Sequence, residues 1–260
     1  MVEAARHETL KKLHALSGVL PLGAFVVIHI WVTSAVTSSR DVYDRQIGWL
    51  HSGWFLGLLE ILLVVAPLLY HAVYGTWRSL QPRDPDHAYD TDLMVSLERA
   101  SGMVVLVFVA AHFWEFRGQT WNGSLPVSSY STKLVEDLSS TQRGVPWIAT
   151  AYFIGIAATC FHLVNGMTSF LTTWGYTRTE AARGRARIVM RIAGVVLFVI
   201  ACGIVLQLAT GVRYFPVDEA KAPLCGPSAP PAITPLPPRA RSSSSAATSA
   251  ATPPVLPSAR

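Results

Sequence analysis

The sequence predicts an all-α membrane protein in which five transmembrane helices form a bundle. Hydrophobic residues make up 51% of the 260-residue chain and charged residues only 14%, and the mean hydropathy is positive. A single soluble core of this size cannot bury so much apolar surface. Five apolar segments are also long enough to cross a hydrocarbon layer of about 30 Å. We place them at about residues 13–37, 53–77, 93–116, 147–174 and 188–212.

The charged flanks of the spans predict their orientation. Residues 1–12 are polar and basic and lack the small-residue cleavage pattern of a secretory signal peptide, so we expect the first span to be retained. Lys and Arg are concentrated before the first span and in the connections after the second and fourth spans. The positive-inside rule therefore predicts a cytoplasmic N-terminal segment. Lipid, and no nucleic acid, should surround the membrane domain, residues 13–213.

The C-terminal residues, 214–260, differ in composition from the membrane domain. Five crossings place them outside the membrane, on the side opposite the N-terminus. Eleven of the 17 prolines lie between residues 216 and 260, among many Ala and Ser residues. Such a segment contains too little apolar surface to offset the entropy lost on ordering. We expect a disordered tail.

Four histidines lie alone in the first four spans: His29, His71, His112 and His162. A buried imidazole is costly in hydrocarbon unless a partner or a metal satisfies it. Alternating helix directions fix the depth of each residue. His29 lies roughly 12 Å and His112 roughly 7 Å from the outer ends of their helices. They form the outer pair, and His71 and His162, which lie in the inner half, form the inner pair.

The sequence around these histidines is repeated. A Ser-Gly pair precedes the histidine by about three turns in the first and third spans, and a glycine follows it by four residues in HAVYG and HLVNG. A glycine on the face of a ligating histidine leaves room for a flat macrocycle. We infer a helical hairpin used twice that holds two haem groups, each with two imidazole ligands. Iron ligated in this way has no open position, which suits electron transfer.

Two other sequence features bear on this interpretation. The three cysteines form neither a CxxC nor a CxxCH motif, so covalent c-type haem is not indicated and the haem would be held non-covalently. A lone transmembrane histidine is, however, also common as a hydrogen-bonded packing residue, and small residues often mark helix contacts. Two depth-matched pairs in a repeated frame favour haem ligation over packing.

Glu60 of the second span and His51, just before that span, are candidates for quinone and proton chemistry. Glu60 precedes His71 by three turns, so both side chains share one face, and no Lys or Arg lies in the same span. An intramembrane carboxyl group is usually protonated and could exchange protons with a quinone near the outer haem. His51, at the outer mouth of this span, could complete the site. The alternatives are a structural hydrogen bond for Glu60 and an interfacial position for His51.

Four residues near the inner surface are candidates for contacts to haem propionates: His14, Ser17, Arg99 and Ser101. Ser101 precedes His112 by three turns and faces the same side of its helix. Arg99 offers a fixed positive charge, although ordinary positive-inside anchoring explains it equally well. In the fifth span, which has no histidine, Gln207 is expected to form a hydrogen bond across helices.

Four segments resemble a known family: LHALSGVLPLGAFVVIH, GLLEILLVVAPLLYHAVYG, LERASGMVVLVFVAAHFWE and YFIGIAATCFHLVNGMTSFLTTWG. They are similar to successive helices of the five-helix, dihaem cytochrome b membrane anchor of succinate:quinone oxidoreductases, a type related to dihaem fumarate reductases. The resemblance covers roughly residues 10–213. It implies that His29 and His112 ligate the outer, distal haem b and that His71 and His162 ligate the inner, proximal haem b.

The resemblance also implies partners and a location. The family's membrane subunit anchors a cytoplasmic FAD flavoprotein, which interconverts succinate and fumarate, through an iron–sulfur subunit. Electrons pass over the two haems to or from menaquinone or another quinone. Succinate chemistry would therefore belong to the partner subunits, and the chain would be a multi-pass protein of a bacterial inner membrane.

Two alternative functions are compatible with buried histidines. The chain could be the dihaem cytochrome b anchor of another respiratory enzyme, of the hydrogenase or nitrate reductase type. Those proteins often take several ligands from one helix, whereas here each of four helices supplies one. It could also be a proton or metal transporter that uses buried histidines. Such transporters usually carry more acidic residues or broken helices in their spans than this chain does.

Overall fold

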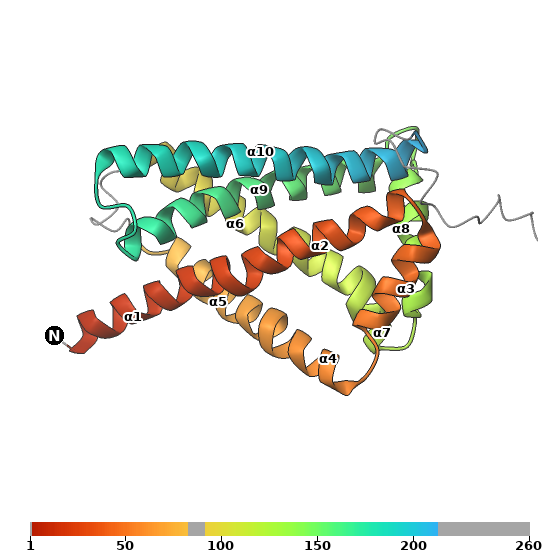
Figure 1. Cartoon of the computed structure of the whole chain (residues 1–260), viewed down its shortest axis with the longest axis horizontal. Coiled ribbons are helices and arrows are strands. Elements are labelled where there is room, and N and C mark those ends of the chain that lie inside the picture. The colour runs from red at the N-terminus through yellow and green to blue at the C-terminus, as the bar shows by residue number, and fades with distance from the viewer. Residues whose placement is uncertain (1, 83–91, 213–260) are drawn as a thin grey trace, which may run out of the picture. The chain divides into compact units, whose positions relative to one another are not determined.

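A computed structural model describes residues 2–82 and 92–212, and this part of the chain contains five helices long and apolar enough to cross a membrane (Figure 1). They extend over Arg6–Thr37, Trp54–Ser79, Leu93–Trp121, Trp147–Thr173 and Glu180–Thr210. These described residues contain no β-strand. The predicted all-α class with five spans is confirmed. The predicted tail, residues 214–260, lies outside the described residues.

Three of the spans are interrupted by a π-helical turn, which the sequence analysis did not foresee. The segments of each span follow in chain order. The first span consists of α1 (Val2–Ser17), η1 (Gly18–Gly23), α2 (Ala24–Ser34) and η2 (Ala35–Thr37), and the second of α4 (Trp54–Glu60), η3 (Ile61–Val65) and α5 (Ala66–Ser79). The third consists of α6 (Asp92–Phe113), η5 (Trp114–Gly118) and α7 (Gln119–Trp121). The fourth and fifth, α9 (Trp147–Thr173) and α10 (Glu180–Thr210), are continuous.

Proline explains two of these π turns. Pro21 lies within η1, and Pro67 lies in the first turn of α5, just after η3. Proline has no N–H and its ring clashes with the carbonyl one turn earlier, so the regular helical ladder must adjust at that point. The third turn, η5, contains no proline. It ends at Gly118, where a Cβ atom would lie 2.6 Å from the Trp114 ring, so only glycine allows this close approach.

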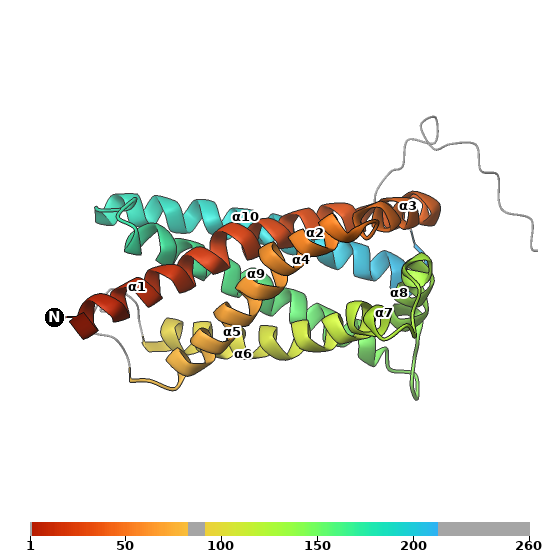
Figure 2. The same cartoon turned by 90° about the horizontal axis from the view of Figure 1, so that it is seen from below.

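Short helices outside the spans gather at one end of the bundle. These are α3 (Arg40–Leu50), η6 (Val127–Ser129) and α8 (Tyr130–Ser139), and we call this end the capped end. Figure 1 shows α3, α7 and α8 beside the end of α2, and the start of α1 at the opposite end. The same separation is seen in the turned view of Figure 2. From the sequence, no helix was expected between the spans in this part of the chain.

The buried apolar core is concentrated at the capped end. Its residues come from the cap helices, α9, α10 and the ends of the first and third spans; they are Val36, Tyr43, Ile47, Phe116, Tyr130, Leu134, Leu138, Ala149, Tyr152, Ile204 and Val205. Along α10, by contrast, many apolar side chains are exposed, among them Ile192, Val195 and Val199. Exposed aliphatic side chains on a membrane helix are suited to contact with lipid. The two findings explain why few residues in the spans are buried by protein alone.

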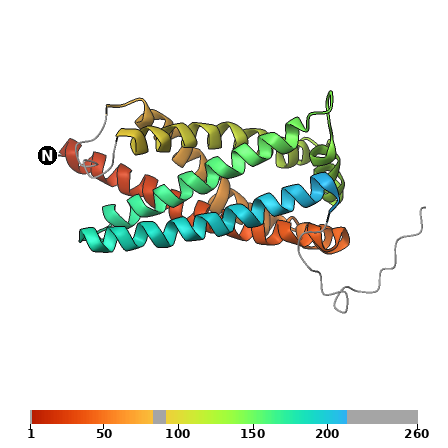
Figure 3. The ribbon, with the colours of Figure 1, turned by 90° about the horizontal axis from the view of Figure 1, so that it is seen from above.

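Small residues let the helices approach closely around α9, which lies beside α10 and α6 (Figure 3). A Cβ atom on Gly155 would lie 2.3 Å from the Phe108 ring, and one on Gly194 would lie 2.3 Å from Val164 Cγ2. Such contacts are typical of membrane helix pairs. Gln207 of α10 donates a 2.8 Å hydrogen bond to the carbonyl of Thr37 at the end of the first span, which confirms its expected bond across helices.

Candidate functional site

The structure brings the four histidines together in the two pairs predicted from depth. The ring centroids of His29 and His112 lie 5.8 Å apart, with an interplanar angle of 76°. Those of His71 and His162 lie 6.1 Å apart at 86°. Each pair joins two spans: the outer pair joins α2 and α6, and the inner pair joins α5 and α9.

These separations fit two imidazoles on opposite sides of one metal ion. A metal lies about 2 Å from an imidazole nitrogen that binds it, so the two ring centres lie about 6 Å apart. Among the described residues, no three His, Cys, Asp or Glu side chains form a group that could hold a metal ion. A site with two protein ligands suits a metal that brings its other ligands with it, as haem iron does.

The inner histidines are held by the same arrangement, used twice. His71 Nδ1–H donates to the carbonyl of His14 at 3.1 Å, and Ser17 Oγ lies 3.4 Å from the same nitrogen. Ser17 Oγ–H also donates to that carbonyl, at 2.8 Å. A carbonyl can only accept, so Nδ1 carries the proton and Nε2 keeps its lone pair for a metal.

The second copy of this arrangement holds His162. Its Nδ1–H donates to the carbonyl of Glu98 at 3.3 Å, and Ser101 Oγ lies 3.5 Å from the same nitrogen. Ser101 Oγ–H donates to the Glu98 carbonyl at 2.9 Å. The repeated Ser-Gly pairs therefore support the inner pair, on the helix opposite each inner histidine.

Glycines lie directly against the inner histidine rings. A Cβ atom on Gly18 would lie 2.5 Å from His71 Cε1, and one on Gly102 would lie 3.0 Å from His162 Cε1. On the second span, a Cβ atom on Gly75 would lie 3.0 Å from His14 Cε1. Gly166, the other glycine of the predicted HxxxG pattern, has nothing within 4 Å of an added Cβ. The space at the two inner histidine rings thus depends on the absence of two side chains, and Gly75 leaves the space that the His14 ring occupies.

The outer histidines have different surroundings. Each stacks on a phenylalanine one turn earlier, His29 on Phe25 with centroids 5.4 Å apart and His112 on Phe108 at 5.9 Å. His112 Nδ1 lies 3.0 Å from the Tyr152 hydroxyl. The Nδ1 atom of His112 therefore contacts a side-chain hydroxyl, whereas the Nδ1 atoms of the inner histidines contact backbone carbonyls.

The residues predicted to contact propionates lie at the inner end, around the inner pair. His14 stacks on His71 with ring centroids 4.0 Å apart, and its buried Nδ1 has no hydrogen-bond partner in the described structure. That nitrogen is available to a polar group of a bound cofactor. Ser17 and Ser101 lie instead at the Nδ1 atoms of the inner histidines, as described above. Arg99 lies half-buried on α6, two residues before Ser101.

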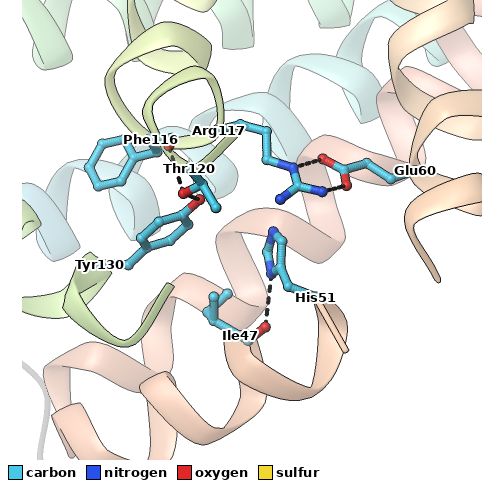
Figure 4. A network of polar contacts seen from close by, with 7 residues as sticks. All are labelled: Ile47, His51, Glu60, Phe116, Arg117, Thr120 and Tyr130. Carbon is cyan, nitrogen blue, oxygen red and sulfur yellow. Dashed lines mark hydrogen bonds and ion pairs between the residues drawn. The ribbon is translucent and has the colours of Figure 1, made fainter. Parts of the chain in front are cut away.

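Glu60 has a charged partner from another span, which was not expected from the sequence (Figure 4). Arg117 of η5 binds both carboxylate oxygens of Glu60, with Nε donating to Oε1 at 2.6 Å and the terminal nitrogen donating to Oε2. The pair is half-buried. A contact in which a guanidinium binds both oxygens of a carboxylate is strong and directional, so Glu60 has a fixed partner across two spans.

His51 lies close to this ion pair without joining it. Its Nδ1–H donates to the Ile47 carbonyl at 2.8 Å, and its ring meets the Tyr130 ring edge-on with centroids 5.9 Å apart. Figure 4 shows the His51 ring below the Arg117 guanidinium. Arg117 also lies over the Trp121 ring, 5.3 Å from its centroid. An acid, a cation and an imidazole therefore gather at the capped end of the second and third spans.

Arg117 and Tyr152 were not singled out from the sequence. Arg117 follows His112 by five residues, a spacing that a regular helix would place off the histidine's face, and only the π turn brings it inward. Tyr152 lies ten residues before His162 on the same helix. The sequence does contain a signal for Tyr152. This tyrosine of the fourth span lies at about the same depth as His112 of the third span.

One curated protein with significant similarity is the succinate dehydrogenase cytochrome b558 subunit of Bacillus subtilis (strain 168). It is 29% identical to this chain over 175 residues, which cover 66% of this chain and 83% of that protein. No family model matches the chain, and no solved structure matches it. The relative confirms the resemblance that the four helical segments indicated.

Proposed function

This chain is a relative of the cytochrome b subunit of succinate dehydrogenase, and on that premise we propose that it passes electrons between a partner iron–sulfur subunit and a membrane quinone. The observation that carries the proposal is the presence of two histidine pairs whose ring centroids lie 5.8 Å and 6.1 Å apart, at two depths of the bundle. Two haem b groups, when bound, would supply two one-electron iron couples.

The chain's own residues would hold these groups as follows. His29 and His112 would ligate the outer haem, and His71 and His162 the inner haem. The Nδ1 atoms of both inner histidines donate to backbone carbonyls, which orients the rings and leaves Nε2 as the ligand atom. The buried, unpartnered Nδ1 of His14 fits a propionate contact, and Arg99 remains a candidate for another.

Ser17 and Ser101 would act on the inner ligands rather than on propionates. Each hydroxyl donates to the carbonyl that accepts from the histidine, and each oxygen also lies within 3.5 Å of the histidine Nδ1. A shared acceptor and a nearby hydroxyl keep the imidazole from rotating. The repeated Ser-Gly pair then has two functions, orientation by the serine and space by the glycine.

The quinone is proposed to react at the capped end, beside Glu60, Arg117 and His51. Reduction of a quinone requires protons, and the reverse reaction releases them. The Glu60 carboxylate can accept a proton, and the Arg117 guanidinium can donate hydrogen bonds to a carbonyl oxygen of the ring. His51 has one ring nitrogen free of the Ile47 hydrogen bond and can relay a proton to the surface.

The partners are proposed from the family resemblance, and the orientation from charge. An FAD flavoprotein would interconvert succinate and fumarate, and an iron–sulfur subunit would connect it to this chain. Basic residues cluster at the N-terminal end of the bundle and in the first turns of α10. The positive-inside rule places this end in the cytoplasm of a bacterium, where both soluble partners would bind.

The test is to purify the chain with its natural partners from membranes. Mass spectrometry should find a flavoprotein and an iron–sulfur protein in equal amounts with it. Succinate should then reduce a b-type absorbance, and a quinone analogue should reoxidise it. Copurification of a hydrogenase or nitrate reductase subunit, or a preparation without b-type absorbance, would contradict the proposal.

A further inference from the structure

The two histidine pairs differ in the hydrogen-bond partners of their Nδ1 atoms. Behind both inner histidines are neutral backbone carbonyls. Behind His112 is the hydroxyl of Tyr152, at 3.0 Å, and behind that hydroxyl is a carboxylate, with Glu115 Oε2 3.4 Å from the same oxygen. His112, Tyr152 and Glu115 thus form a chain of two hydrogen bonds that ends on a group able to carry negative charge.

The number of protons determines which group donates in each of these two hydrogen bonds. A tyrosine hydroxyl has one proton to donate. If it went to His112 Nδ1, the remaining proton of a neutral imidazole would be on Nε2, and Nε2 could not bind a metal. Ligation through Nε2 therefore requires His112 Nδ1–H to donate to Tyr152, and Tyr152 O–H to donate to Glu115.

The fold holds the three hydrogen-bonded residues in place. Tyr152 is buried on α9, and its ring meets Phe108 edge-on with centroids 5.4 Å apart. Gly155, one turn later, leaves the space that Phe108 occupies. Glu115 lies in the π turn η5, three residues after His112, and is half-buried. The π turn therefore places Glu115 behind Tyr152 on one side and Arg117 at Glu60 on the other.

We propose that Tyr152 and Glu115 are positioning residues for the outer haem, which together strengthen His112 as an electron donor to iron. This inference rests on the proposed function, because it assumes that His112 is a ligand. A hydrogen bond from the far nitrogen of a ligating histidine to a carboxylate raises the basicity of the ligand. Here Tyr152 lies between the histidine and the carboxylate and transmits the effect of Glu115 to His112. Stronger electron donation from His112 stabilises ferric iron. These hydrogen bonds therefore lower the midpoint potential of the outer haem and leave that of the inner haem unaffected.

The experiment is a redox titration of the purified complex, followed at the two haem absorbances, for three single variants. Tyr152→Phe keeps the ring but removes both hydrogen bonds. Glu115→Gln keeps an acceptor for Tyr152 but removes the charge. Glu136→Gln is the control, because it removes one exposed carboxylate from α8 at the same end without touching Tyr152.

We expect Tyr152→Phe to shift the ferric/ferrous equilibrium of the outer haem toward ferrous by about tenfold, or about 59 mV for one electron. Glu115→Gln should shift it in the same direction by less, and Glu136→Gln should not shift it. The double variant should match Tyr152→Phe alone, because both residues act through one chain. The inner haem should keep its potential in all of them.

Other outcomes separate this inference from the proposed function. Two haems with unchanged outer potential in Tyr152→Phe, or equal shifts of both haems, would overturn the inference and leave the function standing. If Tyr152→Phe loses the outer haem, Glu115→Gln decides, since it retains Tyr152: a raised potential supports the chain and an unchanged one overturns it. A parent protein without haem would overturn the proposed function itself.

Discussion

Replacing Gly18 with alanine should selectively weaken haem binding at the proposed inner site. The added Cβ would lie 2.5 Å from His71 Cε1 and 2.9 Å from Nδ1, which is closer than side-chain atoms approach each other. The His71 ring would have to move. Any movement strains its 3.1 Å hydrogen bond to the His14 carbonyl and its stacking on the His14 ring.

The expected cost follows from two opposing effects. Overpacking of this kind costs about 1–3 kcal/mol, and replacing a helical glycine with alanine returns about 0.5–1 kcal/mol. A net loss of about 1.4 kcal/mol corresponds to a tenfold weaker inner site. We therefore expect Gly18→Ala to bind the inner haem about tenfold more weakly and the outer haem as before.

The assay is titration of the haem-depleted protein with haemin, followed by reduced-minus-oxidised spectra. Gly57→Ala, in α4 of the second span, is the matched control because nothing lies within 4 Å of its added Cβ. An inner site of parental affinity in Gly18→Ala would refute the reasoning, and so would equal loss in Gly57→Ala.

Three further predictions concern other contacts. Arg117→Met should lower the thermal midpoint in detergent, because it leaves the half-buried Glu60 carboxylate unpaired at a cost of about 1–3 kcal/mol. The double variant with Glu60→Gln should recover most of this loss. Additive losses in the double variant would contradict the pairing. Gln207→Leu should cost about 1 kcal/mol by the same measurement, since the Thr37 carbonyl loses its partner, and unchanged stability would show that the bond contributes nothing. Ser101→Ala should broaden or shift the inner haem absorbance without haem loss, whereas a change in the outer absorbance would contradict its position at His162.

Much of the bundle was predictable because lipid restricts the possible structures. A membrane span must satisfy its own backbone, so five long apolar segments imply five helices. Alternating directions then fix the depth of each histidine, and the structure brings together His29 with His112 and His71 with His162. These depths follow from the alternating directions of the spans and the rise per residue of a helix.

The surroundings of the histidines were less predictable. The Ser-Gly repeat was noticed, and depth and helical face suggested propionate contacts for Ser17 and Ser101; their contacts to the Nδ1 atoms of His71 and His162 were not expected. Which face a serine presents depends on how two helices rotate against each other. A one-dimensional pattern does not contain that rotation.

The π turn η5 accounts for two of the residues that were missed, Glu115 and Arg117. Helical periodicity assumes 3.6 residues per turn, and a single π turn shifts every later residue around the axis. The turn at Trp114–Gly118 directs Arg117 to Glu60 and Glu115 to Tyr152. The cap helices α3 and α8 were missed for a different reason, since they are short and polar and gain their stability from packing at Tyr43, Leu134 and Leu138.

The most direct test of the central claim is the haem content and spectrum of four single variants, each with one of the paired histidines replaced by alanine. The parent should contain two haem b per chain. His29→Ala and His112→Ala should both lose the same haem, His71→Ala and His162→Ala should both lose the other, and each variant should keep the remaining one. Any other grouping of the four variants, or a parent with one haem or none, would contradict the two pairs.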